Sequence, residues 1–479
     1  MLNIELNKVG EMMFEFNLNE HNLNYVHFIG IGGISMSGIA SLLLNKGYKI
    51  SGSDRSLSDR VNKLKEDGAE IYIGQRKENI TNPDLVVYTD AILDDNEELI
   101  EARGLGVPVV SRGVFLGALM RNYHKSIAVS GSHGKSTATS MISKILLNSS
   151  EDATILLGGE LDDMDGNVHV GDDKYLVTEA CEYKGNIRYF FPQTVIVLNI
   201  DEDHLDYYKD LDDIVDTFKA YLANQDEHSK TILNLNEENN KLIIDSVKGE
   251  LITYAQENYD ADYVAHNIKF DEIGRPNFDL KMKDGSIEHF ELGVIGRHNI
   301  NNAMASIIAT YENGIDLDTI KENLRIYSGL KRRMEIIGHV NDATIMTDYG
   351  HHPSEIEVTL AALKEHTEGK LVCIWQPHTY SRTKSLFNDF LNCFDSADEV
   401  IVTDIYAARE KFDSSIHSKD VVEALNKKGI NAKYLGTFEQ ARDYIYQIAD
   451  ENDLILTTGC GNPDVLAQMI VDDQVKVSA

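Results

Sequence analysis

Several features are scarce in this 479-residue chain, and each scarcity excludes a class of protein. The four cysteines (Cys181, Cys373, Cys393 and Cys460) form no CxxC pair, which argues against a disulfide framework or a zinc site and favours buried thiols in a reducing cytoplasm. No run approaches the roughly 18 consecutive apolar residues of a membrane helix. The first twenty residues lack the basic start and apolar core of a secretory signal. We therefore expect a cytoplasmic protein without membrane insertion.

Basic residues are also few. Lys and Arg number 45 against 78 Asp and Glu, which gives a formal net charge of −33. Such a chain lacks the positive surface that binds nucleic acid, and the simplest role of the excess charge is solubility. An anionic substrate must then be held by local devices such as helix N-termini, a few Lys and Arg side chains, and metal ions.

The sequence instead contains alternating strand and helix patterns in three series. Short apolar runs that often end in glycine, such as VHFIG and SIAVSG, are separated by helical stretches, a pattern typical of parallel sheets built from βαβ units. A more β-rich stretch spans residues 230–295. We predict three α/β domains after an extension that the pattern leaves unassigned, with bounds at 1–24, 25–123, 124–329 and 330–479.

The strongest single motif is SIAVSGSHGKSTAT at residues 126–139. A predicted strand runs into a glycine-rich turn, and a helix follows, so backbone N–H groups and the helix N-terminus can surround a phosphate. Lys135 would reach the β- and γ-phosphates of ATP, and the hydroxyl of Ser136 or Thr137 would hold Mg²⁺. The general P-loop pattern has an earlier glycine, where this chain has Val129. The predicted ATP-binding turn comprises Gly131, Ser132, His133, Gly134, Lys135, Ser136 and Thr137.

The chain resembles the Mur ligase family in several motifs that occur in the family's order. These are GIGGISMSGIA at 30–40, GSHGKST at 131–137, GRHNINNA at 296–303, KRRME at 331–335, DYGHHPSE at 348–355 and QPHTYSRT at 376–383. The resemblance implies a Rossmann-like UDP-binding domain, a central P-loop ATPase-type α/β domain and a C-terminal Rossmann-like domain. It also implies ATP-dependent ligation of L-alanine to the lactoyl carboxylate of UDP-N-acetylmuramate through an acyl phosphate, with ATP and Mg²⁺ as cofactors. We expect a monomer or weak homodimer.

The first glycine cluster follows a strand and opens a helix. A nicotinamide-binding GxGxxG would need glycine where Ser35 stands, and the family implies a loop around the diphosphate of a UDP-sugar instead. Asp54 is either a ligand of a ribose hydroxyl or a solvated strand end. The family usually has Ser-Ser-Ala where this chain has Thr89-Asp90-Ala91. The expected sugar-nucleotide residues of this domain are Gly30, Gly32, Gly33, Ser35, Ser37 and Asp54.

A glutamate and a histidine lie near the ends of two predicted strands of the central domain. Glu179 ends YLVTEAC, and His204 lies in NIDEDHLD just past the next strand. The family places Mg²⁺ ligands at both positions, and we expect catalytic roles for Lys135, Glu179 and His204. Glu182 is a weaker metal candidate, and the thiol of Cys181 is expected to be packed and inert. Some sister ligases use a carbamylated lysine here, but NIDEDHLDYY contains none.

The remaining expected contacts lie later in the chain. Asn299 and Asn302 are three residues apart and share a helix face. The family uses them for adenine recognition, although a helix cap is the alternative. Arg332 and Arg333 resemble its ATP-phosphate arginine, and Asp348 and Tyr349 its ribose- and adenine-side contacts. The candidate holders of the alanine carboxylate are His351, His378 and Arg382.

Three rival functions fit parts of the sequence. A recycling ligase that adds a ready-made peptide to the same sugar nucleotide would share most motifs. A non-catalytic nucleotide-binding relative would be expected to lack Lys135, Glu179 or His204, all of which are present. A nicotinamide dehydrogenase conflicts with Ser35.

Overall fold

The computed structural model describes residues 4–6, 12–18, 23–164, 166–205, 207–257, 260–271, 274–408 and 410–477. Within these residues the chain forms two compact units, one of 1–266, 280–288 and 301–325, the other of 267–279, 289–300 and 326–479.

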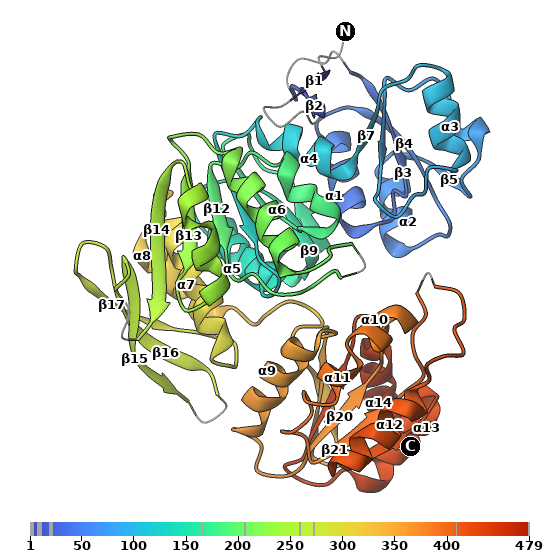
Figure 1. Cartoon of the computed structure of the whole chain (residues 1–479), viewed down its shortest axis with the longest axis vertical. Coiled ribbons are helices and arrows are strands. Elements are labelled where there is room, and N and C mark those ends of the chain that lie inside the picture. Colours follow the sequence, from blue (N-terminus) through green and yellow to red (C-terminus); the bar gives the residue numbers. More distant parts are fainter. Residues whose placement is uncertain are drawn as a thin grey trace. The chain divides into compact units, whose positions relative to one another are not determined.

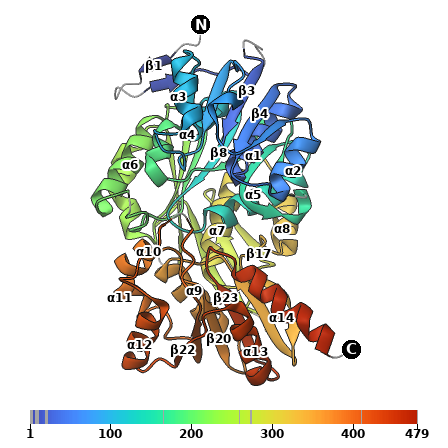
Figure 2. The same ribbon diagram turned by 90° about the vertical axis from the view of Figure 1, so that its right-hand side faces the viewer.

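The strands form four sheets (Figures 1 and 2). Their bounds are β1 (Ile4–Leu6), β2 (Met12–Phe14), β3 (Tyr25–Ile29), β4 (Lys49–Asp54), β5 (Glu70–Ile73), β6 (Leu85–Tyr88), β7 (Val109–Ser111), β8 (Lys125–Ser130), β9 (Thr154–Leu161), β10 (Gly166–His169), β11 (Tyr175–Glu179), β12 (Thr194–Val197), β13 (Lys230–Asn234), β14 (Glu250–Gln256), β15 (Tyr263–Phe270), β16 (Pro276–Lys281), β17 (Ile287–Glu291), β18 (Glu335–Val340), β19 (Ala343–Asp348), β20 (Leu371–Trp375), β21 (Glu399–Val402), β22 (Ala432–Tyr434) and β23 (Leu454–Thr458).

Helices connect most of these strands. The α-helices are α1 (Ile34–Asn45), α2 (Asp59–Glu66), α3 (Glu97–Gly104), α4 (Arg112–Met120), α5 (Lys135–Leu147), α6 (Leu211–Ala223), α7 (His298–Tyr311), α8 (Leu317–Ile326), α9 (Pro353–Lys364), α10 (Tyr380–Ser385), α11 (Phe387–Phe390), α12 (Ser418–Lys428), α13 (Phe438–Ile448) and α14 (Pro463–Val477). Short 3₁₀ helices are η1 (Lys77–Asn79), η2 (Asp162–Met164), η3 (Tyr183–Tyr189) and η4 (Glu238–Ser246).

The first sheet has the order β5-β4-β3-β6-β7, and all its pairs are parallel. This is the order of a Rossmann-like half, in which ligands bind beyond the carboxyl ends of the strands where the order reverses. That point lies between β3 and β6, and the glycine cluster at 30–38 follows β3. The predicted parallel sheet of this domain is therefore confirmed.

A buried polar network fastens one face of this sheet. Glu98 of α3 is fully buried and accepts hydrogen bonds from Ser53 Oγ and Asn79 Nδ2, both at 2.6 Å. His27 Nδ1 lies 2.7 Å from Ser51 Oγ, and its Nε2 lies 3.8 Å from Glu98 Oε1. Because buried polar groups need partners, the network holds β4, and with it the strand end at Asp54, in one register.

The second sheet has ten strands in the order β10-β9-β11-β8-β12-β13-β14-β15-β16-β17. Parallel strands β11 and β12 flank β8 on its two sides, with Thr178 and Val195 both beside Ala128. The carboxyl ends of three neighbouring strands therefore meet at one edge. The core beneath them is apolar and includes Val129, Leu176 and Val197, which are all fully buried.

The six-stranded sheet of the second unit has the order β18-β19-β23-β20-β21-β22. Its strands are parallel except for the antiparallel edge strand β18. Helix α14 packs along β18, β19 and β23, and the buried Trp375 packs at tilted ring angles against Phe390 and Phe394 on the other face. The predicted fold class of three α/β domains is confirmed. Its domain bounds stay predictions.

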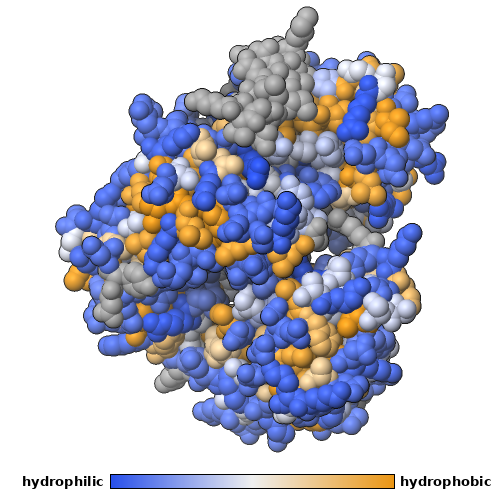
Figure 3. Space-filling model, viewed as in Figure 1, coloured by the Kyte–Doolittle hydropathy of each residue, from blue (hydrophilic) through white to orange (hydrophobic). Residues whose placement is uncertain are grey.

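The face shown in Figure 3 is covered mainly by hydrophilic residues, with apolar patches between them, as expected for a chain with a net charge of −33. Among the residues that the structure describes, none of the helices combines the length and the apolar content needed to span a lipid bilayer.

Candidate active site

The glycine-rich turn of residues 131–134 follows β8 and leads directly into α5; it is called the phosphate turn below. Gly131 has φ +131° and Gly134, the N-cap of α5, has φ +83°, both in the region that favours glycine. No side chain caps this helix. Its first N–H groups and its dipole therefore face the turn, which is the arrangement that binds phosphate.

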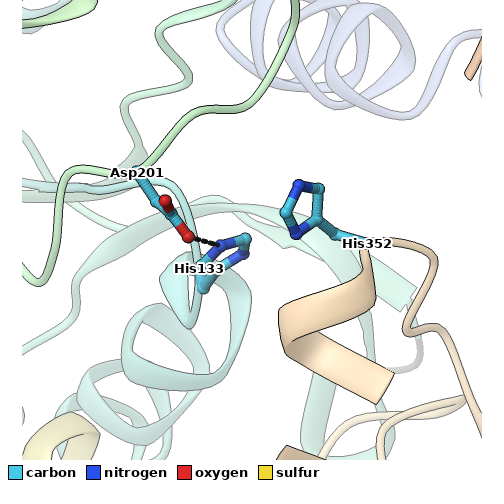
Figure 4. A group of neighbouring side chains, drawn as sticks. All are labelled: His133, Asp201 and His352. Carbon is cyan, nitrogen blue, oxygen red and sulfur yellow. Dashed lines mark hydrogen bonds and ion pairs between the residues drawn. The ribbon is translucent and has the colours of Figure 1, made fainter. Parts of the chain in front are cut away.

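Contacts to the segment after β12 hold this turn in shape. The backbone N–H of His133 donates to Asn199 Oδ1 at 2.7 Å, and Asn199 Nδ2 donates back to the carbonyl of His133 at 3.1 Å. Ser132 Oγ accepts from the N–H of Asp201 at 2.8 Å. Figure 4 shows His133 and Asp201 pointing toward each other, with Nε2 and Oδ2 3.2 Å apart; it also shows His352 at the start of α9. Hydrogen bonds to the segment after β12 therefore fix the shape of the turn.

The ammonium of Lys135 points back into the turn. It donates to the carbonyls of Gly131 and Ser132, and lies 3.2 Å and 3.4 Å from the two carboxylate oxygens of Glu182. Burial favours its neutral form, but the charge of Glu182 outweighs burial, so the pKa of Lys135 lies above its ordinary value. Lys135 is therefore a fixed positive charge at the phosphate turn.

Three further side chains converge beside Lys135. Glu182, Asp203 and His204 each offer a ligand atom, and these atoms lie within 4.8 Å of one another. His204 has φ +56°, an uncommon backbone for a non-glycine residue, and its ring packs on Tyr183 with centroids 4.9 Å apart. Two carboxylates and an imidazole suit a divalent cation.

The hydroxyls predicted to hold Mg²⁺ fit such an ion. Ser136 and Thr137 lie partly buried in the first turn of α5. Neither hydroxyl makes a hydrogen bond to another residue in the part of the chain that the structure describes. An oxygen donor left without a protein partner beside a phosphate turn is the donor chemistry that Mg²⁺ uses.

Glu179 takes a different direction from the other acidic groups. Its Oε1 accepts the backbone N–H of Gly158 on β9 at 2.8 Å, whereas the group at Lys135 contains Glu182, the candidate that the sequence analysis ranks lower. Just after Glu182, Lys184 and Gly185 of η3 have left-handed backbones. Burial raises the pKa of the Cys181 thiol to about 11, which fits a packed thiol.

The first glycine cluster is tightly built around β4. The N–H of Gly32 donates to Asp54 Oδ2 at 2.8 Å, and a Cβ at Gly30 would lie 2.5 Å from Thr89 Cγ2. Ser37 Oγ donates to the carbonyl of Ile34 at 3.0 Å, and Gly33 is the N-cap of α1. Asp54 thus shapes the glycine loop, a role that neither alternative in the sequence analysis included.

Arg112 is a candidate that the sequence analysis missed. It opens α4 after β7, so it reaches the same carboxyl edge of the first sheet. Its Nη1 lies 3.4 Å from Ser35 Oγ, and its Nη2 lies 3.7 Å from Asp90 Oδ2. Asp90 also accepts from Asn186 Nδ2 at 2.8 Å. The only available signal was an arginine at a strand-to-helix junction, which many folds contain.

The two asparagines of α7 are both buried but make different contacts. Asn299 Nδ2 donates to the carbonyl of Ile295 at 2.8 Å, just before the helix. Asn302 lies against the phosphate turn, where a Cβ on Gly134 would be 2.5 Å from Asn302 Oδ1. The structure therefore brings Asn302 to the turn, and adenine recognition by either residue stays a prediction.

In the second unit, both arginines of KRRME lie over the ring of Tyr349. Its ring lies 4.8 Å from the guanidinium of Arg332 and 5.1 Å from that of Arg333. Arg332 also donates to the carbonyl of Gly461 at 2.8 Å, which commits it to its own domain. Burial raises the pKa of Asp348, whose carboxylate accepts the N–H groups of Gly350 and Met334.

The three candidates for the alanine carboxylate lie in the same sheet's loops. The rings of His351 and His378 are 6.5 Å apart, and His378 stacks on Tyr406 at 5.8 Å. Arg382 lies on α10, whose N-cap Thr379 directly follows His378. Burial raises the pKa of the Cys460 thiol to about 12, and the charge of Arg382 opposes that rise. The structure thus brings His351 and His378 together, with Arg382 on the adjoining helix.

The chain belongs to the Mur ligase family. Three family models match it in order: "Mur ligase family, catalytic domain" at residues 25–124, "Mur ligase middle domain" at 129–310 and "Mur ligase, glutamate ligase domain" at 332–461. The matched segments cover all three α/β sheets, and the family resemblance drawn from the sequence is therefore confirmed.

Similar proteins span almost the whole chain. UDP-N-acetylmuramate–L-alanine ligases from Alkaliphilus metalliredigens and Clostridium botulinum strain Okra are each 44% identical, over 96% of this chain and 100% of theirs. The crystal structure of UDP-N-acetylmuramate–alanine ligase from Thermotoga maritima matches with TM-score 0.79 at 27% identity, covering 95% of this chain and 100% of that one. A murein peptide ligase from Psychrobacter arcticus shares the fold, with TM-score 0.69 at 24% identity over 93% and 98% of the chains.

Proposed function

We propose that this chain is the cytoplasmic ligase that joins L-alanine to the lactoyl carboxylate of UDP-N-acetylmuramate with ATP, giving ADP and phosphate. The reaction supplies a peptidoglycan precursor and so serves cell-wall biogenesis, cell shape and cell division. One observation carries the proposal: Lys135 and the metal-capable group of Glu182, Asp203 and His204 meet at the phosphate turn. The full-length similarity to alanine-adding ligases supports the substrates.

The three predicted domains would divide the substrates among them. Residues 25–123 would hold the UDP-sugar through the loop at Gly30–Gly33 and through Arg112. Residues 124–329 would hold the triphosphate at the turn before α5. Residues 330–479 would supply Arg333, Asp348 and Tyr349 to ATP, and His351, His378 and Arg382 to the carboxylate of alanine, where an arginine can form a bidentate clamp.

Amide formation requires an activated carboxylate, because oxide is a poor leaving group. The lactoyl carboxylate would attack the γ-phosphorus of ATP, displacing ADP and forming an acyl phosphate. The alanine amine would then attack the acyl carbon, and phosphate would leave. Lys135 and the N–H groups of the turn would stabilise charge on the transferring phosphoryl group. The hydroxyl of Ser136 or Thr137, with Glu182, Asp203 and His204, would hold Mg²⁺, which neutralises phosphate charge when bound.

A phosphate-release assay tests this function. The purified chain is given ATP, Mg²⁺ and UDP-N-acetylmuramate with L-alanine, glycine, L-serine or the recycled tripeptide in turn, and L-alanine is expected to give the highest kcat/KM. A preference for the tripeptide would favour the recycling ligase, and the absence of any ATP consumption would refute the ligase itself.

A lysine pair supplies the matched control. Lys135→Ala should reduce turnover by about 10³-fold or more, because a charge aligned with the transferring phosphoryl is lost. Lys230→Ala breaks another lysine–glutamate pair, with Glu312 at 2.8 Å, away from the turn, and should leave turnover near wild type. Near-normal turnover in folded Lys135→Ala would contradict the role of the turn.

A further inference from the structure

The carboxylate of Glu182 is enclosed beside the phosphate turn. Its side chain is only 2% exposed, and the Lys135 ammonium 3.2 Å away neutralises it. A buried carboxylate that loses its counter-charge is strongly destabilised. Glu182 and Lys135 therefore neutralise each other in this structure.

The other side of Glu182 faces the metal-capable group. Its Oε1 lies 4.0 Å from His204 Nε2, which is itself 3.7 Å from Asp203 Oδ2. The main chain at Glu182 is fixed, because its carbonyl accepts hydrogen bonds from Tyr208 OH at 2.5 Å and from the N–H of Gly185 at 2.8 Å. The carboxylate thus lies between an ammonium and a pair of potential cation ligands.

Nucleotide binding creates a competition for Lys135. The phosphates of ATP need the ammonium that Glu182 holds, because the turn contains no other lysine. When the phosphates take it, Glu182 must find another positive charge in the same buried place. A divalent cation beside His204 and Asp203 would supply that charge without moving the main chain.

We propose that Glu182 exchanges partners during ATP binding: it pairs with Lys135 in the nucleotide-free chain and passes to the divalent cation at His204 and Asp203 when phosphate takes Lys135. Glu182 then opposes the binding of ATP without metal and couples the affinity for ATP to the affinity for metal. This coupling is reciprocal by thermodynamic linkage. The inference rests on the proposed function, in that the turn binds ATP together with Mg²⁺.

Calorimetric titration of ATP without sugar nucleotide or amino acid tests the exchange free of turnover. Affinity is measured with EDTA and with Mg²⁺, for wild type and for Glu182→Gln, which keeps the size and one acceptor oxygen but removes the charge. In EDTA, Glu182→Gln should bind ATP about tenfold more tightly, because the competing carboxylate is gone. The factor by which Mg²⁺ improves ATP affinity should shrink by about tenfold, within the usual range of coupling.

Glu312→Gln is the matched control, since it removes the charge of another lysine-paired glutamate in the same unit and should change neither quantity. Weaker ATP binding in EDTA, or an unchanged Mg²⁺ factor, in Glu182→Gln would overturn the exchange. A wild type whose ATP affinity ignores Mg²⁺ would instead overturn the proposed metal site. The two failures are therefore distinguishable.

A second measurement covers the case in which Glu182→Gln does not fold. Lys135→Met leaves Glu182 in need of a cation, so Mn²⁺ should bind the nucleotide-free variant about tenfold more tightly than it binds wild type, as measured by electron paramagnetic resonance of free Mn²⁺. Equal or weaker Mn²⁺ binding by Lys135→Met would overturn the proposal.

Discussion

The side-chain oxygen of Asn302 lies only 2.5 Å from the position that a Cβ on Gly134 would take. Helix α7, which comes late in the central domain, thus packs directly against Gly134 at the end of the phosphate turn. Gly134 also has a left-handed backbone, with φ +83°. Two independent constraints, one conformational and one steric, therefore restrict this position to glycine.

Gly134→Ala should weaken ATP binding by about tenfold or more, because relief of the clash and of about 1–2 kcal/mol of left-handed strain would shift the N–H groups of the turn. The measurement is ATP affinity by calorimetry, with thermal unfolding in parallel. Gly314→Ala is the control, since Gly314 has φ +98° but its nearest neighbour to a new Cβ is 3.9 Å away. Equal ATP affinities in the two variants would contradict this account.

Asp90→Asn should lower the KM for UDP-N-acetylmuramate. The asparagine can still accept from Asn186, but Arg112 loses its partial neutralisation and turns its charge toward the diphosphate at the glycine loop. A half-buried pair of this kind suggests an effect of about 1 kcal/mol, or roughly fivefold. Asp94→Asn removes an exposed carboxylate 3.5 Å from Arg103 and should not change KM. A raised KM in Asp90→Asn would show that Asp90 orients Arg112 productively.

Gly117→Ala should destabilise the first unit. A Cβ at this position of α4 would lie 1.9 Å from the backbone carbonyl oxygen of Tyr189, and backbone cannot move away as a side chain can. Overpacking costs about 1–3 kcal/mol and at times more, measured as a fall in the urea midpoint. The opposite result is expected for Gly104→Ala at the end of α3, where nothing lies within 4 Å and alanine gains about 0.5–1 kcal/mol. Equal midpoints would contradict the packing.

His298 should make stability depend on pH. Burial and the nearby charge of Arg333 lower its pKa to about 4, and its Nδ1 is enclosed with no hydrogen-bond partner among the described residues. The unfolded chain therefore binds the proton near pH 6.5 and the folded chain only near pH 4. Stability is unaffected above pH 6.5 and falls as pH drops through this window, by up to about 3 kcal/mol.

The contribution of His298 is isolated by its replacement. The difference in urea midpoint between wild type and His298→Gln should change between pH 7 and pH 4.5 in the direction that favours the variant at low pH, because glutamine takes up no proton. Carboxylates and other histidines cancel in this difference. A difference that stays constant with pH would exclude a buried neutral His298.

Much of the fold follows from local sequence pattern. The run VHFIG ends in a glycine with φ +81°, and β3 with its following loop occupies that place. The edge strands β18 and β22 escaped the pattern, because EIIGHV and AKY have little continuous apolar character. Edge strands expose one side to solvent, so the hydrophobic signal that identifies central strands is weak there.

The site was predictable as far as it lies in one stretch of chain. The turn with Lys135 could be located from its residue types, whereas the contact of Asn302 with Gly134 joins residues far apart in sequence. Glu182 ranked below Glu179 because residue spacing does not give side-chain direction after a strand ends. The chain just after Glu182 also has left-handed backbones at Lys184 and Gly185, and a lysine with positive φ is not foreseeable from propensity.

The three neighbouring strand ends at β11, β8 and β12 have a consequence for the life of the chain before catalysis. The turn before α5 takes its shape only after these parallel strands have paired, so an unfolded chain offers ATP no comparable site. ATP present at 100 times its dissociation constant would then add about 2.7 kcal/mol to the native state by mass action. The energy charge of the cell would thereby also set how much of this protein survives heat and proteases.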